Sequence, residues 1–203
     1  MDQHVRAEMR ARIRRVHDEL KSTTIYVTHD QAEAISVCDR LAILHQAELQ
    51  QIGTVDEIWN HPANKFVASF VGEPPMNFIN AKVETPQRAF VLTKEGKRIF
   101  GFKGQVDQKY IGVGAVCLGV RPQQIALSRD KMPEQSIAGS IKIIEFQGDR
   151  VVLTVGLEDL DNTDVKVVTE TAKAGRMEET VWLNFKPEII HLFHEETPII
   201  QRM

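Results

Sequence analysis

The hydrophobic pattern changes character about one third of the way along the chain. Near the start, five apolar residues recur four, four, three and four positions apart: Val5, Met9, Ile13, Val16 and Leu20. This spacing places them on one face of an amphipathic helix. The next apolar run, Thr23–Thr28, is rich in β-branched residues and predicts a buried strand.

Two capping boxes follow this run. In each, a polar side chain that can cap a helix precedes a glutamate by three positions: Asp30 with Glu33, and Thr54 with Glu57. The glutamate can return a hydrogen bond to the capping residue, so we expect a helix after each box.

A strand pair and one more helix complete the first third. The strands are expected at Asp39–Leu44 and Leu49–Ile52, around a short turn. Asn60–Pro62 ends the helix that begins after Thr54, Asn64 opens another, and Gly72 stops it.

After Glu73-Pro74-Pro75 the chain consists of short alternating or apolar runs separated by glycine-containing turns. The runs are Ala89–Leu92, Arg98–Phe102, Ala115–Val120, Ile137–Glu145, Val151–Val155, Val165–Thr169, Thr180–Phe185 and Ile189–Phe193. Many short strands at this spacing indicate a small β-barrel or sandwich. We therefore expect a domain boundary near residues 73–77.

Composition excludes several classes of protein. The 203 residues carry a formal net charge of −3, which gives no electrostatic reason to bind nucleic acid or an anionic membrane. No apolar stretch approaches the roughly 18 residues that span a bilayer, and the arginine-rich N-terminus has no secretory core. Cys38 and Cys117 are expected to be free buried thiols. These features favour a cytoplasmic protein.

His29 is the first candidate for chemistry. It lies where the expected strand Thr23–Thr28 ends, and open α/β sheets bind ligands beyond the carboxyl ends of their strands. The residues alone leave a second interpretation open, and favour it: a hydrogen-bonded histidine at a helix N-terminus.

The flanking residues narrow the choice. The segment Tyr26–Ala34 resembles the switch-histidine loop (H-loop) of ABC-transporter ATPase subunits. The end of that nucleotide-binding domain is resembled by Cys38–Leu44 and Gln51–Ile58. The junction peculiar to its sugar-import branch is resembled by His61–Gly72 and Pro75–Phe78, and the C-terminal TOBE-type regulatory domain by Leu118–Pro122 and Phe185–Phe193. The branch includes maltose, multiple-sugar and glycerol-phosphate importers.

This resemblance implies an α/β remnant of a P-loop ATPase domain, about residues 1–73, followed by an all-β OB-like (TOBE) barrel, 74–203. It implies that His29 contacts the γ-phosphate of ATP and that Asp2 stands for the aspartate of the D-loop. ATP and magnesium are the cofactors of the intact family, whose ATPase activity drives transport. The regulatory domain implies contacts between two subunits.

The sequence departs from the family in two ways. The phosphate loop, glutamine loop, signature loop and Walker B acid have no counterpart among the printed residues. We therefore expect that the polypeptide as printed does not hydrolyse ATP, and that a truncated gene or a partial piece of the protein accounts for this. The glycine-rich run Gly112–Gly119 lacks the lysine-threonine ending and is no substitute. In addition, the turn His45–Glu48 lacks the usual glycine.

Other candidate sites are weaker. Arg121 is a candidate anion contact, because related β-modules bind oxyanions, although a surface or salt-bridge role is the simpler interpretation. His191 and His194 would face opposite sides of a strand, which argues against zinc. The acidic group Glu158, Asp159, Asp161 and Asp164 lacks the calcium-loop glycine and suits a solvated hairpin. No metal site is expected.

For partners, the resemblance implies the membrane subunits of a transporter, with the chain peripheral to the inner membrane and not inserted in it. An incomplete sheet exposes apolar faces, so we expect a homodimer or higher self-association. Two alternatives stay open: a free-standing regulatory module that binds a protein or a small anion, and one half of a split ATPase.

Overall fold

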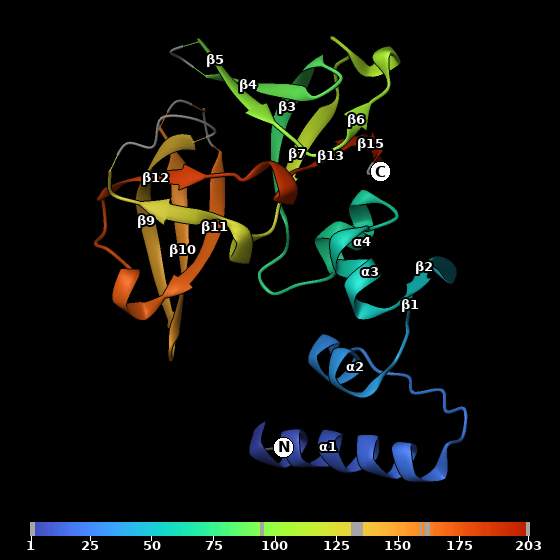
Figure 1. The fold of residues 1–203 in the computed structure, drawn as a ribbon. Coiled ribbons are helices and arrows are strands. Elements are labelled where there is room, and N and C mark those ends of the chain that lie inside the picture. The colour runs from blue at the N-terminus through green and yellow to red at the C-terminus, as the bar shows by residue number, and fades with distance from the viewer. Residues whose placement is uncertain (1–2, 94–95, 131–135, 159, 161–162, 202–203) are drawn as a thin grey trace. The chain divides into compact units, whose positions relative to one another are not determined.

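The structure is a computed structural model that describes residues 3–93, 96–130, 136–158, 160 and 163–201 (Figure 1). By its internal contacts the chain divides into two compact units, Met1–Ala63 and Asn64–Met203. This division precedes the expected boundary near residues 73–77 because helix α4, Lys65–Phe70, lies with the second unit. The assignment of 1–73 and 74–203 to two ancestral domains stays a prediction.

The first unit contains three helices and one hairpin. The helices are α1 (Gln3–Leu20), α2 (Gln31–Val37) and α3 (Val55–Asn60), and the strands are β1 (Leu41–His45) and β2 (Glu48–Gly53). The strands pair antiparallel. The three helices and the hairpin confirm the sequence predictions for these segments.

The predicted buried strand at Thr23–Thr28 is wrong. Residues 22–28 carry no strand, and the side chains of Ile25 and Val27 are 89% and 90% exposed. An apolar, β-branched run becomes a buried strand only where a neighbouring strand pairs with it and other side chains cover it. Among the described residues of this unit, β1 and β2 pair only with each other.

The predicted capping box is complete at Thr54 and Glu57, whereas at Asp30 the structure gives one half of the box. The Asp30 carboxylate accepts a hydrogen bond from the Glu33 amide at 3.1 Å. Thr54 and Glu57 form a complete capping box, in which the Glu57 carboxylate accepts from the Thr54 amide at 2.7 Å and the Thr54 hydroxyl accepts from the Glu57 amide at 3.2 Å. These bonds satisfy amides that a helix leaves without partners in its first turn.

The β1–β2 turn adopts left-handed backbone conformations without glycine. Gln46 and Ala47 have φ angles of 50° and 65°. Two consecutive positive φ angles match the type I′ turn that fits the twist of a hairpin. The missing glycine therefore leaves the turn type unchanged but adds backbone strain.

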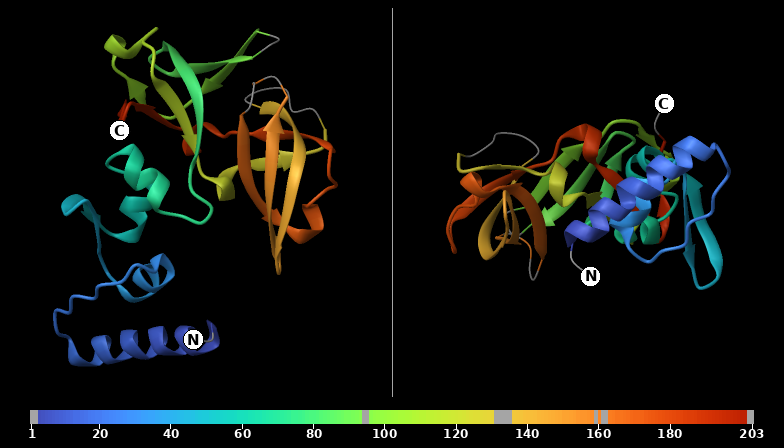
Figure 2. Two further views of the ribbon diagram at one scale, coloured as in Figure 1. Left: turned by 180° about the vertical axis from the view of Figure 1, so that it is seen from behind. Right: turned by 90° about the horizontal axis from the view of Figure 1, so that it is seen from below.

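The second unit combines α4 with two larger sheets. Its strands are β3 (Asn77–Thr85), β4 (Arg88–Thr93), β5 (Gly96–Gly101), β6 (Gln105–Val106), β7 (Val116–Val120), β8 (Ala126–Ser128), β9 (Ser136–Gln147), β10 (Arg150–Leu157), β11 (Asp164–Glu170), β12 (Thr180–Asn184), β13 (His191–His194), β14 (Thr197–Pro198) and β15 (Ile200–Gln201). The sheet orders are β11-β10-β9-β12-β8 and β14-β13-β7-β3-β4-β5, and β15 pairs with β6. In Figures 1 and 2, β9, β10 and β11 lie side by side.

Each of the eight runs predicted in this region falls on a strand. Strand β3 was not predicted, although its buried residues Ile79, Ala81 and Val83 alternate with more exposed ones. That period of two is the signal that identifies it.

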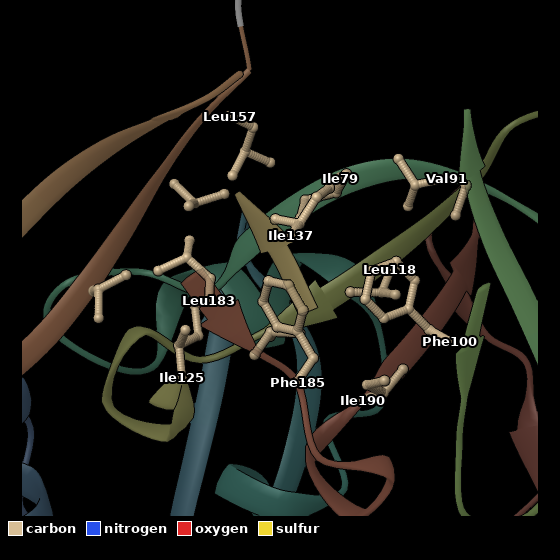
Figure 3. Packing of buried hydrophobic residues seen from close by; sticks show 14 of the residues in the cluster. Ile79, Val91, Phe100, Leu118, Ile125, Ile137, Leu157, Leu183, Phe185 and Ile190 are labelled. Atoms are coloured by element: carbon tan, nitrogen blue, oxygen red, sulfur yellow. The ribbon is translucent and has the colours of Figure 1, made fainter. Parts of the chain in front are cut away.

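One large hydrophobic core unites the two sheets. Leu118 on β7, Ile137 on β9 and Phe185 after β12 are each at most 1% exposed (Figure 3). Leu153 on β10 belongs to the same cluster and is fully buried. The rings of Phe100 and Phe185 meet edge to face at 5.5 Å between centroids. Residues from both sheets share this interior, which makes the unit one packed body.

Cys38 and Cys117 are both free. Cys117 is buried, as expected, and Cys38 is only half-buried. No helix in the described part of the chain is long and apolar enough to cross a membrane.

Candidate functional site

His29 lies at the end of the extended segment and directly before Asp30, the N-cap of α2. Its side chain is exposed, and no described residue is a hydrogen-bond partner of its imidazole. The interpretation of His29 as a hydrogen-bonded structural histidine therefore finds no support. The imidazole is accessible to a ligand or to another polypeptide.

Hydrogen bonds that link Thr28 to Glu33 of α2 and to Asp30 fix the backbone on both sides of His29. The Thr28 hydroxyl donates a hydrogen bond to the Glu33 carboxylate at 2.9 Å and accepts one from the Asp30 amide at 3.0 Å. The Tyr26 hydroxyl donates to the same carboxylate at 3.2 Å. Glu33 is only 9% exposed, so these donors satisfy a carboxylate that burial would otherwise destabilise.

Sequence reasoning assigned Glu33 to a capping box and did not predict these hydroxyl partners. The signal was present as two hydroxyl residues, Tyr26 and Thr28, shortly before the acid. Partial burial, followed by the negative charge of Glu33, raises the pKa of Tyr26. The Tyr26 hydroxyl therefore stays protonated at neutral pH and remains a donor.

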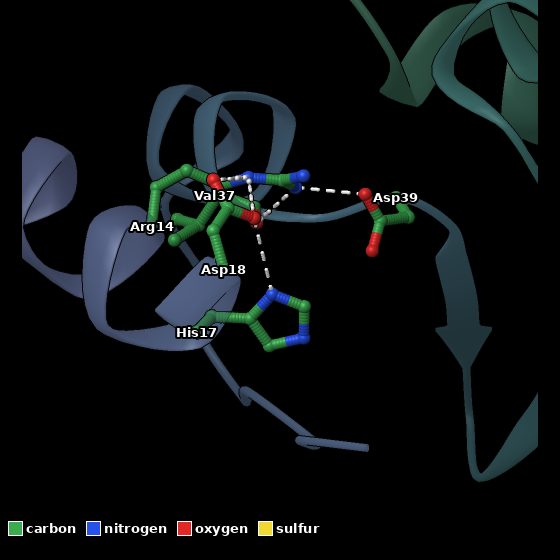
Figure 4. Close-up of polar contacts among 5 residues, drawn as sticks. All are labelled: Arg14, His17, Asp18, Val37 and Asp39. Atoms are coloured by element: carbon green, nitrogen blue, oxygen red, sulfur yellow. Dashed lines mark hydrogen bonds and ion pairs between the residues drawn. The ribbon is translucent and has the colours of Figure 1, made fainter. Parts of the chain in front are cut away.

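Arg14 ties α1 to the end of α2. Its guanidinium donates to the Val37 carbonyl at 3.3 Å and to the Asp39 carboxylate at 2.8 Å, and it pairs with Asp18 at 3.0 Å (Figure 4). His17 Nδ1 lies 3.6 Å from the Asp18 carboxylate. Hydrogen bonds from Arg14, together with its charge, lower the pKa of Asp39.

The predicted apolar face of α1 stays largely uncovered within the described residues. Val5, Val16 and Leu20 are 49%, 47% and 67% exposed. Together with Ile25 and Val27 they give the first unit an extensive exposed apolar surface, which is unusual for a soluble monomer. Asp2, the other predicted nucleotide contact, lies outside the described residues.

Arg121 is not a surface residue. Its side chain is 1% exposed, and its guanidinium donates to the carbonyls of Ala68 and Val71 at the end of α4. Burial lowers its pKa to about 10, so it stays charged at neutral pH. A cation beside the last carbonyls of a helix compensates the negative end of the helix dipole, and this geometry favours a structural role over an anion contact.

The described residues contain no cluster of histidine, cysteine or acidic side chains that could hold a metal. His191 is 8% exposed and stacks on Phe193, whereas His194 packs against Tyr110. Within the acidic group, the Lys142 ammonium donates to Asp164 at 2.6 Å. Its members Asp159 and Asp161 lie outside the described residues.

Comparison with known proteins gives a family match within the second unit. Residues 118–193 match the TOBE domain family. A solved structure of the cytoplasmic molybdate-binding protein ModG, with molybdate bound, covers 57% of this chain and 94% of its own, at 14% identity and a TM-score of 0.43. That likeness is too weak to support an inference about ligands.

Curated relatives match both units. The sn-glycerol-3-phosphate import ATP-binding protein UgpC of Psychromonas ingrahamii is 31% identical over 202 residues, which are 97% of this chain and 51% of the relative. The xylose/arabinose import ATP-binding protein XacK of Haloferax volcanii is 32% identical over 203 residues, 97% of this chain and 50% of the relative. The maltose/maltodextrin import ATP-binding protein MalK of Yersinia pestis is 30% identical over 211 residues, 100% of this chain and 54% of the relative. The chain spans about half the length of these relatives.

Proposed function

Because the chain contains a TOBE domain and is related along its whole length to ATP-binding subunits of sugar and glycerol-phosphate importers, we propose that it is the C-terminal part of such a subunit. The observation that carries the proposal is the match of 97–100% of the chain to relatives named as import ATP-binding proteins. The resemblance predicted from the sequence is confirmed. The ligands of this chain and its role in transport, given below, are our proposals.

We propose that His29 acts as the switch histidine and contacts the γ-phosphate of ATP. The exposed imidazole and the hydrogen bonds that hold Thr28 and Asp30 on either side of it support this role. A fixed backbone presents the ring at a defined position, which phosphoryl transfer requires of the groups that orient the attacking water. Asp2 remains the proposed D-loop aspartate.

The chemistry of the whole subunit needs groups that the printed residues do not include. A glycine-rich loop with its lysine cradles the phosphates, and an acidic side chain holds the magnesium ion. A histidine alone cannot replace them. We propose that the 203-residue chain by itself neither retains nor hydrolyses ATP, and that ATP and magnesium bind only where the rest of such a domain is present.

We propose that the chain works at the cytoplasmic side of the membrane through the membrane subunits of an importer. The exposed apolar residues of the first unit support a further expectation: the isolated chain self-associates, because association removes apolar surface from water. Gel filtration with light scattering tests this. A stable monomer at every concentration contradicts it.

The proposed function is tested by exchanging halves with a relative. Residues 1–203 replace the matched half of the glycerol-phosphate relative, and ATP hydrolysis by the chimaera is measured with its membrane subunits. We expect hydrolysis that a His29→Ala substitution lowers by roughly 100-fold or more, as removal of a group acting in the transition state does. His45→Ala, at the end of strand β1, is the matched control and leaves the rate unchanged. Equal rates for both variants contradict the role of His29.

The alternative of a free-standing binding module is tested by calorimetry. Sugars, phosphate and molybdate are titrated into the purified chain. The importer proposal predicts no tight binding to any of them, and micromolar or tighter affinity for one of them favours the alternative.

A further inference from the structure

The backbone that connects the two units is hydrogen-bonded to the first unit as far as Ala63. From Asn64 onward it is hydrogen-bonded within the second unit. On the first side, the side-chain amide of Gln51 on β2 clamps the backbone. Its Nε2 donates to the His61 carbonyl at 3.0 Å, and its Oε1 accepts from the Ala63 amide at 2.8 Å. The His61 amide also donates to the Glu57 carbonyl at 2.7 Å. Residues 61–63 are therefore held as an extension of the first unit.

On the other side, the backbone joins the β-rich unit at once. The Asn64 side chain caps α4 by accepting from the Val67 amide at 2.8 Å. The Lys65 amide donates to the Glu196 carbonyl at 2.8 Å, and the Lys65 ammonium lies 5.0 Å from the centre of the Phe78 ring.

The rest of α4 is fixed to the same unit. Ala68 is fully buried in a small cluster with Met76, Cys117 and Phe193. The buried Arg121 guanidinium binds the carbonyls of Ala68 and Val71. Although α4 precedes the proline-containing segment that marks the change of sequence texture, its bonds make it a part of the β-rich unit.

We propose that any reorientation between the two units takes place at the single junction Ala63–Asn64, and that Gln51 is the positioning residue that confines it there. The clamp uses both ends of one side-chain amide, so it fixes the backbone at two points two residues apart. Without it, the backbone beyond His61 loses its attachment to the first unit, and the one-residue hinge becomes a longer tether. This inference does not depend on the transported solute or on nucleotide.

A narrow hinge has a functional consequence. A single junction limits the orientations that two rigid bodies can adopt to those that the torsions of one link allow, whereas a tether of several residues allows many more. Gln51 therefore limits the range of orientations between the two units.

The test uses the full chain and backbone amide relaxation by NMR. In the wild-type protein we expect separate rotational correlation times for the two units, with order parameters for His61 and Ala63 of about 0.85, typical of rigid backbone. In Gln51→Ala we expect the order parameter of Ala63 to fall below about 0.6. Amide exchange at Ala63 is expected to rise at least tenfold.

Two further variants keep the result interpretable. Gln50→Ala removes the same side chain one position earlier and is expected to leave Ala63 rigid. Gln51→Glu keeps an acceptor for the Ala63 amide but loses the donor for the His61 carbonyl, so protection of Ala63 should survive even if Gln51→Ala fails to fold. One correlation time for the whole chain, or equal effects of Gln50→Ala and Gln51→Ala, overturns the proposal.

Discussion

The Arg121 guanidinium donates a hydrogen bond to the Val71 carbonyl across 50 residues of sequence, inside the β-rich unit. It binds the Ala68 carbonyl as well, at 3.5 Å. A charged side chain that is 1% exposed is tolerated because it satisfies helix-end carbonyls that would otherwise be buried without donors. Arg121 is thus a tie between α4 and the start of the segment that follows β7.

Removing this tie should cost far more stability than removing an exposed arginine. Arg121→Ala leaves buried carbonyls without their donor and creates a cavity, so we expect a loss of about 2–4 kcal/mol in the free energy of unfolding. Arg129→Ala is the control. The Arg129 side chain is 52% exposed in its ion pair with Glu179, and exposed pairs contribute about 1 kcal/mol or less. Urea unfolding monitored by Trp182 fluorescence in a Trp59→Phe background measures both, and similar losses would contradict the structural role of Arg121.

The hairpin turn offers a stabilising substitution. Ala47 has a φ angle of 65°, a conformation that costs a residue with a side chain roughly 1–2 kcal/mol and glycine very little. We expect Ala47→Gly to stabilise the first unit by about 0.5–1 kcal/mol. Ala42→Gly, in strand β1, should destabilise it by a similar amount. Trp59 fluorescence in a Trp182→Phe background reports this unit alone, and a loss of stability in Ala47→Gly would contradict the turn geometry.

The start of α3 should depend on pH in a defined direction. Hydrogen bonds from the Thr54 backbone amide, and then from its side chain, lower the pKa of Glu57. A carboxyl with a lowered pKa in the folded state stabilises that state above its ordinary pKa of about 4.3, and the contribution is lost as pH falls through the lowered value.

An NMR titration of the Glu57 carboxyl checks this. We expect a midpoint below the ordinary value in the wild-type chain and a midpoint nearer to it in Thr54→Ala. Loss of the Thr54 side chain should also cost about 1 kcal/mol, as for other helix caps. An unshifted midpoint in the wild-type chain would show that the box is not formed in solution.

The hydroxyl of Thr28 should control how His29 is presented. Thr28→Val keeps the shape of the side chain but removes the donor to Glu33 and the acceptor for the Asp30 amide. In the chimaera described above we expect ATP hydrolysis to fall about tenfold while nucleotide binding is retained, because the backbone beside His29 loosens. Thr24→Val, in the exposed part of the same segment, is the control, and an equal loss there would mean that the effect is not local.

Local chemistry was predictable from the sequence where a few neighbouring residues determine it. The caps at Asp30, Thr54 and Asn64 formed as predicted. They depend only on residues within one helical turn.

Features that depend on distant neighbours were not predictable. The sequence of Thr23–Thr28 suits a strand, but burial requires a covering layer, and Ile25 and Val27 are almost fully exposed. The sequence around Arg121 suits a surface arginine, because the helix-end carbonyls to which it donates lie 50 and 53 residues away. The same holds for Gln51, whose partners lie 10 and 12 residues further on.

Our central proposal is that this chain holds the switch histidine and the regulatory domain of an importer subunit but does not bind a nucleotide by itself. The most direct measurement is ATP binding and turnover by the purified 203-residue chain with magnesium. We predict no retention on immobilised ATP and no hydrolysis above background. Hydrolysis by the chain alone that disappears in His29→Ala would contradict the account.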